Sequence, residues 1–428
     1  MLVQNGLMKL FKAVARECVG CDFCKLFIKC GFLETLTERE KREYCVGCGA
    51  CVAACPYEAR QLIELSEEEL RGVREVTVRI DGEKYSLPER ITVLRALEVA
   101  GYKISKFPEW GDERTIFAPC GTGGCFSCAV IIDGKLQPSC ITPVRDGMEI
   151  TAERSEIEKE LPLRIVSSFQ GHAAGGVGTP YQIKPKSFLR AIEVACFAHG
   201  CVLRCPTCQN WTVVYSSVDE PLTPSQAAKL LTYERRRYRV DRLAISGGES
   251  TLNRRWLVSF LKELKKLNKD GKARLHVDTN AVILTEDYID ELCEAGMTDI
   301  GPDVKGLSLE TFMRITGIED EELARRLKDT EWRAVKYLLD EYFDKIFVGV
   351  GIPYNPALIS LEEVYKMGER LASWEPSVQV CVLDYRPEFR RRDIRKPNYE
   401  EMLKVKRILE ESGLECVICQ TEFGFVGP

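Results

Sequence analysis

Hydrophobic residues in the second half of the chain recur in short runs separated by longer amphipathic segments. Residues 223–238 and 256–269 space their apolar side chains as helices do. Strands that alternate with helices indicate parallel β-α-β units, which form either a barrel or an open doubly wound sheet. Six apolar runs are the predicted strands, and a further apolar stretch ends the chain: 188–198, 241–248, 274–280, 297–305, 344–352, 377–385 and, last, 414–420.

Residues 74–152 follow a different pattern. Apolar and polar residues alternate over 75–88 around an Asp81-Gly82 pair, which predicts a hairpin with a tight turn. A short amphipathic helix is predicted at 92–101 and a second hairpin at 128–140. Glycine-rich and polar residues that follow indicate a connector. The predicted modules are a cysteine-rich module at 1–72, a small domain at 73–152, a linker at 153–187 and a large α/β domain at 188–428.

Composition and charge disfavour several classes of protein. The chain has 428 residues, 45% of them hydrophobic, and a formal net charge of −5, which does not suggest a nucleic-acid-binding protein. No apolar run reaches the ~18 residues of a membrane-spanning helix, and the amino-terminal residues lack the pattern of a secretory signal. The 20 cysteines lie mostly in tight clusters, which indicates metal or iron–sulfur ligation in a reducing cytoplasm. We therefore expect a cytoplasmic protein with no membrane or nucleic-acid partner.

The amino-terminal module carries two cysteine runs, one spaced C-x2-C-x2-C-x5-C and one spaced C-x2-C-x2-C-x3-C and followed by Pro56. The pair resembles the bacterial two-cluster ferredoxins, in which the last cysteine of each run ligates the other 4Fe–4S cluster. The first run is longer than the family pattern before its last cysteine, which leaves the crossing of Cys30 open. Paired zinc sites are the alternative. The resemblance assigns Cys18, Cys21, Cys24 and Cys55 to one cluster, and Cys45, Cys48, Cys51 and Cys30 to the other.

The small domain carries four cysteines spaced C-x4-C-x2-C-x11-C, at Cys120, Cys125, Cys128 and Cys140. The first three have the spacing of plant-type 2Fe–2S proteins. Together with residues 77–104 they resemble a β-grasp ferredoxin, and the short gap to the last cysteine resembles the iron–sulfur subunit of succinate dehydrogenase and fumarate reductase. Zinc is again the alternative. Glycines at 121, 123 and 124 fit a loop that wraps a cluster closely, where a Cβ would collide.

Residues 199–210 hold three cysteines, Cys201, Cys205 and Cys208, spaced C-x3-C-x2-C with no fourth. Three ligands leave one iron of a four-iron cluster open, and an open coordination position is typical of a reactive metal site. The motif resembles that of the radical S-adenosylmethionine (SAM) enzymes. The resemblance implies that SAM chelates the fourth iron and is cleaved by one electron to methionine and a 5′-deoxyadenosyl radical.

Three further motifs follow the second, third and fourth predicted strands, at the carboxyl ends where barrel active sites assemble. In the same family a Gly-Gly-Glu grips the SAM amine, and a Thr-Asn pair belongs to the site. The Asp-x-Lys-Gly element resembles glycyl-radical activating enzymes and implies residues that face the substrate or an ion; an exposed ion pair is the alternative. The residues are Gly247, Gly248 and Glu249, then Thr279 and Asn280, then Asp303 and Lys305.

Residues 178–428 as a whole resemble the pyruvate formate-lyase activating enzymes, and more closely the radical SAM member of the AmmeMemoRadiSam set. The resemblance implies an incomplete (β/α)6 TIM-like barrel, preceded by a small α+β ferredoxin module and the β-grasp domain. One position departs from the family, because Thr207 stands where an aromatic residue usually packs on adenine. Trp211 is a candidate to replace it.

The implied function is hydrogen abstraction from a glycyl-radical enzyme or another protein or peptide. The implied cofactors are SAM, three 4Fe–4S clusters and one 2Fe–2S cluster, with electrons entering from an external low-potential donor. An electron-transfer subunit without SAM chemistry, and a dehydrogenase that passes electrons outward, are the alternatives. Cys196, Cys293 and Cys381 are predicted core residues, and Cys416 and Cys419 a structural pair rather than a redox pair.

Overall fold

The computed structural model describes residues 8–33, 44–109, 112–184 and 190–428. The chain forms two compact units. The first contains residues 1–165 together with 199–202 and 211–221, and the second contains 166–198, 203–210 and 222–428. The start of the first predicted strand, residues 188 and 189, lies outside the described part of the chain, as do residues 1–7.

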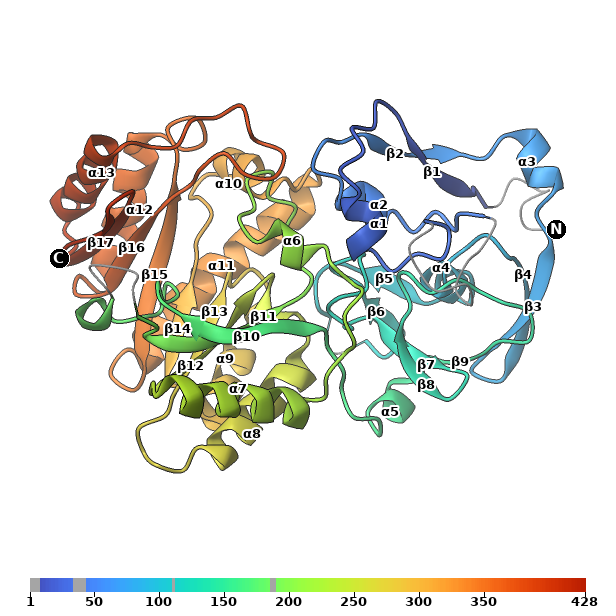
Figure 1. The fold of residues 1–428 in the computed structure, drawn as a ribbon, viewed down its shortest axis with the longest axis horizontal. Coiled ribbons are helices and arrows are strands. Elements are labelled where there is room, and N and C mark those ends of the chain that lie inside the picture. The colour runs from blue at the N-terminus through green and yellow to red at the C-terminus, as the bar shows by residue number, and fades with distance from the viewer. Residues whose placement is uncertain (1–7, 34–43, 110–111, 185–189) are drawn as a thin grey trace. The chain divides into compact units, whose positions relative to one another are not determined.

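The second unit is built on a nine-stranded sheet whose strands follow one another in chain order (Figure 1). A doubly wound sheet reverses its strand order, so this unbroken order has the winding of a barrel. Among the described strands, the seven inner ones are parallel, and β10 and β18 at the edges are antiparallel to their neighbours. The strands are β10 (Val166–His172), β11 (Glu193–Ala198), β12 (Arg242–Gly247), β13 (Arg274–Thr279), β14 (Asp299–Pro302), β15 (Phe347–Tyr354), β16 (Gln379–Asp384), β17 (Cys416–Thr421) and β18 (Gly424–Val426).

The sequence predicts six parallel strands and a linker at 153–187, and the structure corrects both. The final apolar stretch forms β17, which extends the parallel sheet beside β16. Residues 166–172 of the expected linker form β10. Most of their side chains differ in burial from one residue to the next, and their backbone pairs with β11 along the sheet edge. The large domain therefore starts earlier in the chain than residue 188.

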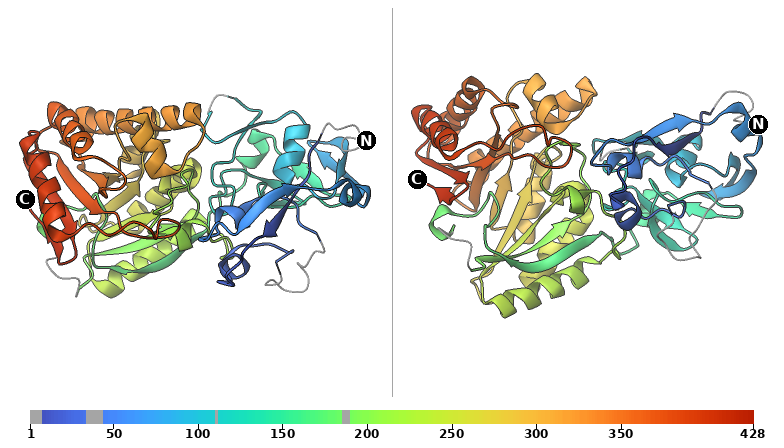
Figure 2. Two further views of the ribbon diagram at one scale, coloured as in Figure 1. Left: turned by 90° about the horizontal axis from the view of Figure 1, so that it is seen from above. Right: turned by 45° about the horizontal axis from the view of Figure 1, so that its top comes forward.

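Helices cover the outer face of this sheet (Figures 1 and 2). Successive strand residues point to opposite faces, so Val350 and Ile352 join the large apolar core under the helices. Gly349 and Gly351 face the other way, toward Val177. The helices are α6 (Trp211–Val214), assigned to the first unit, and in the second unit α7 (Pro224–Tyr238), α8 (Arg254–Leu267), α9 (Glu286–Ala295), α10 (Leu309–Thr316), α11 (Glu321–Tyr342), α12 (Leu361–Trp374) and α13 (Tyr399–Glu411).

The glycine-rich segment after β10 fills the inner face of the sheet. A Cβ on Gly178 would lie 2.5 Å from the backbone of Ile300, and a Cβ on Gly176 would lie 2.0 Å from Asp278 Oδ2. Val177 packs with Cys381 and Ile418 from the far strands. These glycines are therefore needed for close approach of the backbone to the sheet, and the segment is packed interior rather than a connector.

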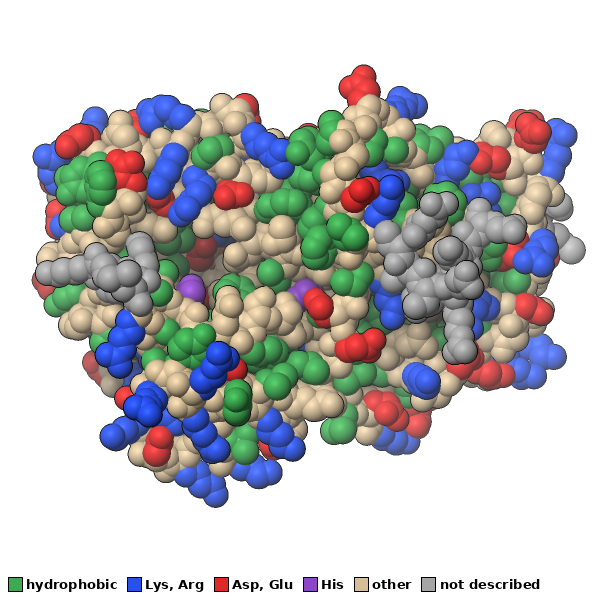
Figure 3. Space-filling model, viewed as in Figure 1, with side chains coloured by type: hydrophobic (Ala, Val, Ile, Leu, Met, Phe, Trp, Pro, Cys, Tyr) green, Lys and Arg blue, Asp and Glu red, His purple; other side chains and the backbone are tan. Residues whose placement is uncertain are grey.

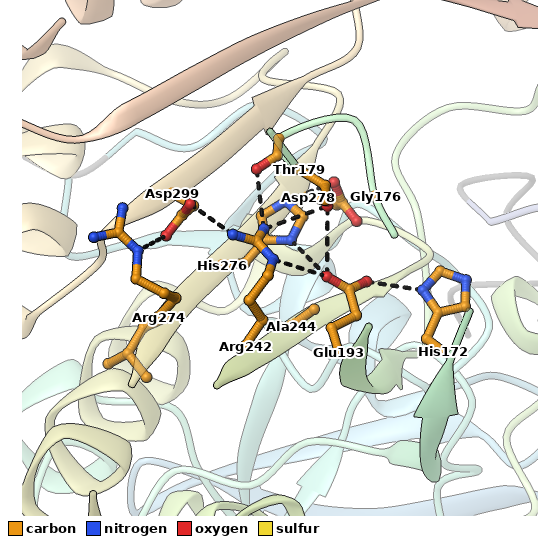
Figure 4. A network of polar contacts seen from close by, with 12 residues as sticks. His172, Gly176, Thr179, Glu193, Arg242, Ala244, Arg274, His276, Asp278 and Asp299 are labelled. Carbon is orange, nitrogen blue, oxygen red and sulfur yellow. Dashed lines mark hydrogen bonds and ion pairs between the residues drawn. The ribbon is translucent and has the colours of Figure 1, made fainter. Parts of the chain in front are cut away.

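A buried ionic network lies near the amino-terminal ends of β11 to β14 (Figure 4). The carboxylate of Glu193 is fully buried and lies 2.8 Å from His172 Nδ1 and 3.4 Å from Arg242 Nε. Arg242 also contacts Asp299 at 2.7 Å, and it donates a hydrogen bond to the Gly178 carbonyl at 3.1 Å. The network thus joins β10, β11, β12 and β14 to the glycine-rich segment.

His276 belongs to this network and gives it a dependence on pH. Burial alone would lower the pKa of His276, but the charge of Asp278 and the contacts with Asp278 and Glu193 raise it to about 9. Arg242 opposes this increase. Since the folded pKa lies above the ordinary value of about 6.5, the resulting stabilisation is complete below pH ~6.5 and is lost as the pH rises through 9.

We therefore expect the free energy of unfolding to fall by on the order of 3 kcal/mol between pH 6.5 and pH 10. Denaturant unfolding at several pH values measures this loss. A His276→Gln variant is the control, because it removes the titrating group, so its stability should change less over the same range. If the free energy of unfolding falls equally with pH in the two proteins, His276 is not the group that causes the loss of stability.

The first unit contains the predicted small domain. Both predicted hairpins are confirmed: β3 pairs with β4, β7 pairs with β8, and the Asp-Gly turns at 81–82 and 133–134 have positive φ at both residues. The five-stranded sheet has the order β4-β3-β9-β7-β8, and β5 and β6 form a separate parallel pair. The elements are β3 (Glu75–Ile80), β4 (Glu83–Pro88), α4 (Val93–Val99), β5 (Lys103–Ser105), β6 (Thr115–Phe117), β7 (Ala129–Ile132), β8 (Lys135–Pro138), β9 (Glu149–Thr151) and α5 (Arg154–Ile157).

The cysteine-rich module is a small α+β structure in the same unit. Its strands form one antiparallel pair with Phe11 opposite Glu64, and its short helices follow cysteine-bearing turns. The elements are β1 (Phe11–Ala15), α1 (Phe23–Phe27), α2 (Ala50–Ala53), β2 (Arg60–Glu64) and α3 (Glu67–Arg71). Among the described helices of the whole chain, none is both long enough and apolar enough to cross a bilayer.

Candidate functional site

The three-cysteine loop begins at the carboxyl end of β11, as predicted. Within the second unit, Arg204 donates its backbone N–H to the Thr316 carbonyl at 2.8 Å, and Cys208 donates to the Cys205 carbonyl at 3.1 Å. Gly317 ends α10 with φ +67°, and a Cβ there would lie 2.5 Å from the Arg204 carbonyl oxygen. The end of α10 therefore fixes the part of the loop that carries Cys205 and Cys208.

A hydrogen bond joins this loop to the Gly-Gly-Glu motif. Asn210 donates from Nδ2 to the Gly247 carbonyl at 2.9 Å, and Gly248 donates its N–H to the Ala198 carbonyl at 2.7 Å. Gly247 has φ +108°, and a Cβ there would lie 2.5 Å from Ala198 N. Gly247 is thus required by the contact between the ends of β11 and β12. Asn210 was missed by the motif analysis, although it follows Cys208 by only two residues.

Glu249 is fully buried, and its carboxylate is occupied by protein donors. Oε1 accepts hydrogen bonds from Thr251 N at 2.9 Å and from the hydroxyls of Thr251 and Thr279 at 2.6 Å each. Oε2 accepts from Asn280 N at 2.7 Å. The structure therefore brings Glu249, Thr279 and Asn280 together, as the motifs predict. It also shows that Glu249 ties the end of β12 to the end of β13; its contact with the SAM amine stays a prediction.

Glu249→Gln is expected to destabilise the protein by about 1–3 kcal/mol, because an amide NH2 would face a backbone or hydroxyl donor and leave it unpaired. Chemical unfolding of the protein without added SAM measures this effect. Glu294→Gln on an exposed position of α9 is the matched control and should change stability little. Equal stabilities of the two variants would show that the carboxylate is not needed for the fold.

Asp303 and Lys305 follow β14 and are not an exposed pair. Lys305 is only 5% exposed, and its ammonium contacts Asp303 at 2.5 Å and donates to Tyr385 Oη at 2.9 Å. The backbone N–H of Lys305 donates to both oxygens of buried Glu331 at 3.1 Å. The buried setting contradicts the alternative of a surface ion pair. A role toward substrate or an ion stays a prediction.

Tyr385 and Glu331 were missed by the sequence analysis. Tyr385 directly follows β16, so its place at the carboxyl end of a parallel strand was the available signal. Glu331 lies on α11 between apolar residues of the buried face, which is an unusual position for a carboxylate. Burial raises the pKa of Glu331 well above its ordinary value.

Lys305 also affects the pKa of a cysteine in the three-cysteine loop. Desolvation raises the pKa of the Cys205 thiol, and the nearby charge of Lys305 opposes that increase. Desolvation likewise raises the pKa of Cys208 to about 12. Coordination to a metal deprotonates a thiol outright, so a bound cluster would offset the raised pKa of both thiols. Thiols that remain partly exposed at a loop surface fit an iron–sulfur cluster with one accessible side.

The basic run at 385–397 lies beside the cysteine loop through its backbone. Arg390 and Arg391 both donate N–H groups to the Pro206 carbonyl, at 2.9 and 3.1 Å. The side chains of Arg391 and Arg395 pair with Asp393 and Glu401. Figure 3 shows acidic and basic side chains interspersed over the visible surface. Arg391 is thus paired within the loop, and Arg395 is paired with α13.

The four cysteines of the small domain converge in its interior. Cys120, Cys125, Cys128 and Cys140 are all buried, and the Sγ atoms of Cys120 and Cys125 are 3.2 Å apart. Backbone N–H groups of Thr122 and Ser127 point at these two sulfurs, each at 3.5 Å. Buried thiols with N–H donors directed at them fit the ligand set of a 2Fe–2S cluster.

Two loop glycines of this domain, Gly123 and Gly124, are closely surrounded by other protein atoms. A Cβ on Gly123 would lie 2.3 Å from Ile141 Cδ1, and a Cβ on Gly124 would lie 2.7 Å from His199 Cβ. Gly121 and Gly123 also have positive φ. Protein contacts therefore already exclude a Cβ at Gly123 and Gly124, and the close wrapping of a cluster by this loop stays a prediction.

The ferredoxin cysteines gather as two runs that share one core. Cys24 and Cys30 of the first run both pack against Cys45 and Cys51 of the second run, around Ala13. Cys45 Sγ accepts N–H groups from Ala13 and Gly47, each at 3.4 Å. Arg60 Nε donates to Cys24 Sγ at 3.1 Å. The ligand crossing itself stays a prediction.

The described residues hold no group of three or more His, Cys, Asp or Glu side chains placed around a single metal ion. Ligands of an iron–sulfur cluster bind separate irons that inorganic sulfide holds apart. Of the remaining cysteines, Cys196 and Cys381 are buried in the core, as predicted, and Cys293 is partly exposed. Cys416 and Cys419 stand three residues apart on β17, so they face opposite sides of the sheet and cannot form a disulfide with each other.

Comparison with known families matches three parts of the chain to domains. Residues 196–367 match the Radical SAM superfamily. The chain contains a radical SAM domain. Residues 73–155 match a 2Fe–2S iron–sulfur cluster binding domain, and residues 41–61 match a 4Fe–4S binding domain. The matches place Cys45, Cys48, Cys51 and Cys55 in the 4Fe–4S domain and all three loop cysteines in the radical SAM domain.

Among curated proteins, the chain is similar to the uncharacterized iron–sulfur protein MJ0092 of Methanocaldococcus jannaschii. The two are 44% identical over 78 residues, which is 17% of this chain and 14% of the relative. The match thus covers a small part of either protein.

Solved structures that contain a similar fold match about half of this chain. Coproporphyrinogen III oxidase from Escherichia coli is 19% identical with a TM-score of 0.33, covering 44% of each chain. SuiB from Streptococcus suis bound to SAM is 15% identical with a TM-score of 0.36, covering 50% of this chain and 42% of that one. The hydrogenase maturase HydG is 16% identical with a TM-score of 0.39, covering 51% and 48%. Similarity of this extent does not indicate which reaction the chain catalyses.

Proposed function

We propose that the chain is an enzyme that cleaves SAM reductively at a 4Fe–4S cluster held by Cys201, Cys205 and Cys208. SAM would supply the 5′-deoxyadenosyl radical, which takes a hydrogen atom from the substrate. The observation that carries the proposal is the hydrogen bond from Asn210 to Gly247. It joins the three-cysteine loop to the Gly-Gly-Glu motif at the carboxyl ends of neighbouring parallel strands.

The residues of the second unit would orient SAM and its surroundings. The carboxylate of Glu249 holds Thr279 and Asn280 at the end of β13, next to the loop that reaches Gly247. Buried Lys305, paired with Asp303 and Tyr385, places a positive charge near Cys205. A fixed cation in a buried site favours the negative charge of a thiolate-bound cluster.

The proposed substrate is a glycine residue of a glycyl-radical enzyme, or another protein or peptide. This assignment rests on the resemblance of residues 178–428, including their Asp-x-Lys-Gly element, to activating enzymes. The ferredoxin and 2Fe–2S modules would relay electrons inward from an external low-potential donor. Two further 4Fe–4S clusters at the amino-terminal cysteines complete the proposed cofactor set.

Electron paramagnetic resonance of the reconstituted, reduced protein tests the proposal. Addition of SAM is expected to change the signal that depends on Cys205 and to yield 5′-deoxyadenosine. No change in that signal would contradict the proposal and favour an electron-transfer subunit. The amount of reductant consumed per deoxyadenosine decides the direction of electron flow, because turnover without external reductant would mean that electrons leave through the N-terminal modules.

A further inference from the structure

The first unit contains short pieces of the chain on both sides of the three-cysteine loop. Residues 199–202 and 211–221 belong to it, so Cys201 lies in the same compact unit as the 2Fe–2S domain and the ferredoxin module. Within this unit, the contacts that residues 199–202 and 211–221 make with the 2Fe–2S domain can be compared with those that they make with the ferredoxin module.

The 2Fe–2S ligand loop touches the residue that precedes Cys201. A Cβ added to Gly200, which has φ +84°, would lie 3.0 Å from the Cβ atoms of both Cys120 and Cys125. From the other side, a Cβ added to Gly124 would lie 2.7 Å from His199 Cβ. Two glycines thus allow the backbone before Cys201 to lie directly against two ligands of the 2Fe–2S site.

Hydrogen bonds fix this approach from several directions. His199 donates its N–H to the Ile165 carbonyl at 3.1 Å, and its own carbonyl accepts from the fully buried Arg164 at 3.3 Å. Ile165 in turn donates to the Gly124 carbonyl at 3.2 Å. Gly200 donates its N–H to the Val214 carbonyl at 3.1 Å. These hydrogen bonds therefore hold the backbone at Gly124 and Gly200 in fixed positions.

The described contacts between the ferredoxin module and residues 211–221 lie at a different place. The ring of Phe23 lies 4.5 Å from that of Trp211, centroid to centroid. Ser217 donates its N–H to the Phe27 carbonyl at 2.8 Å, and its hydroxyl accepts from Lys29 N at 3.0 Å. These contacts start three residues after Cys208 and involve no ferredoxin cysteine.

We propose that Gly124 and Gly200 form the contact through which the 2Fe–2S site exchanges electrons with the site of Cys201. The 2Fe–2S cluster, rather than either ferredoxin cluster, is then the direct redox partner of the radical SAM site. This inference rests on the proposed function and names the last carrier before that site. His199 and Arg164 are positioning residues, since they hold the backbone of Gly200 in place.

The exchange is a simple one-electron step. One electron leaves the site of Cys120 and Cys125 and one electron arrives at the site of Cys201, with no bond made or broken and no proton moved. A low-potential one-electron donor, dithionite in the experiment below, replaces the electron. Because the path runs through the Gly200 backbone and one covalent step to Cys201, its length depends on the two glycines.

Magnetic coupling between the reduced sites tests the proposal without relying on turnover. In the reconstituted full-length protein, the signal of the radical SAM site is the one that a Cys205→Ala variant lacks. We expect a Cys140→Ala variant, which loses the 2Fe–2S cluster, to slow the spin relaxation of that signal severalfold. A Cys48→Ala variant, which loses a ferredoxin cluster, should change it much less. Equal relaxation in wild type and Cys140→Ala, or a larger effect of Cys48→Ala, would overturn the proposal.

Gly124→Ala probes the contact itself. The added methyl group meets His199, so the relaxation should slow although the 2Fe–2S absorption is retained. Gly134→Ala is the matched control, because Gly134 lies in the same domain with φ +75° and has no atom within 4 Å of an added Cβ. Unchanged relaxation in a Gly124→Ala protein that keeps its cluster argues against the contact. If that variant loses its cluster, the comparison of Cys140→Ala with Cys48→Ala decides.

The two proposals fail in distinguishable ways. A radical SAM signal that does not respond to added SAM contradicts the proposed function, whatever the relaxation measurements give. A signal that responds to SAM but relaxes independently of the 2Fe–2S cluster leaves the proposed function standing and overturns only the route.

Discussion

Replacement of Cys205 by alanine is expected to abolish 5′-deoxyadenosine formation while the other iron–sulfur clusters remain bound. Cys205 is one of three thiols on the loop, and a four-iron cluster left with two protein ligands is not held. The remaining twelve predicted ligand cysteines lie in modules with their own sheets and are not altered by the change. Deoxyadenosine is measured by chromatography, and the remaining clusters by iron content and circular dichroism.

Cys196→Ala is the matched control for this experiment. Cys196 lies in β11 and is fully buried, and its thiol donates to the Ala244 carbonyl at 3.7 Å. Its loss should lower stability slightly and leave deoxyadenosine formation in place. Retained product in Cys205→Ala would refute the ligand assignment, and loss of every iron signal would refute the independence of the modules.

Glu193→Ala is expected to cause the largest loss of stability, about 3–5 kcal/mol. The substitution leaves Arg242 and His276 buried without their shared carboxylate, and it removes the contact of His172. Buried charges that lose a partner are costly because the protein interior does not solvate them. The free energy of unfolding is measured with denaturant at neutral pH, followed by the fluorescence of the buried Trp256 and Trp332.

Glu310→Ala provides the comparison. Glu310 pairs with Arg314 on α10, but its side chain is 82% exposed, so its removal should change stability little. A loss for Glu193→Ala no larger than that for Glu310→Ala would mean that the network near the strand starts does not support the fold.

Local patterns in the sequence predict the regular elements well. The Asp-Gly pairs specify their hairpins because both turn residues adopt positive φ, which is a property of the turn itself. Most of the parallel strands are predicted because their apolar runs are bounded by turn signals. Cysteine spacing also predicts the modules, since the ligands of one cluster come from a few neighbouring residues.

Contacts between distant segments are what the sequence does not reveal. Residues 171–185 are glycine-rich and polar, a pattern that predicts a connector. In the structure, Gly176 and Gly178 are required by close contacts with Asp278 and Ile300. The same holds for the buried charges, because Glu193 and Arg242 are 49 residues apart and neither reveals its partner. Pairing across the sheet can be seen only once the strands are placed.

In the candidate site, too, the sequence does not predict contacts between distant residues. Gly-Gly-Glu and Thr-Asn are recognisable as motifs, but the bonds between Glu249 and the end of β13 depend on the register of neighbouring strands. Tyr385 and Glu331 reach Lys305 from elements 80 and 26 residues away. No spacing rule links such positions.

The split of the three-cysteine loop between the two compact units has a practical consequence for truncation. The first unit includes Cys201, whereas the second includes Cys205 and Cys208. No single cut of the chain separates the iron–sulfur modules from an intact three-cysteine site. A fragment that starts at β12 lacks all three thiols, and one that starts at β10 loses Arg164 and Ile165, which hold His199. Domain dissection by expression of separate fragments would therefore produce two incomplete proteins.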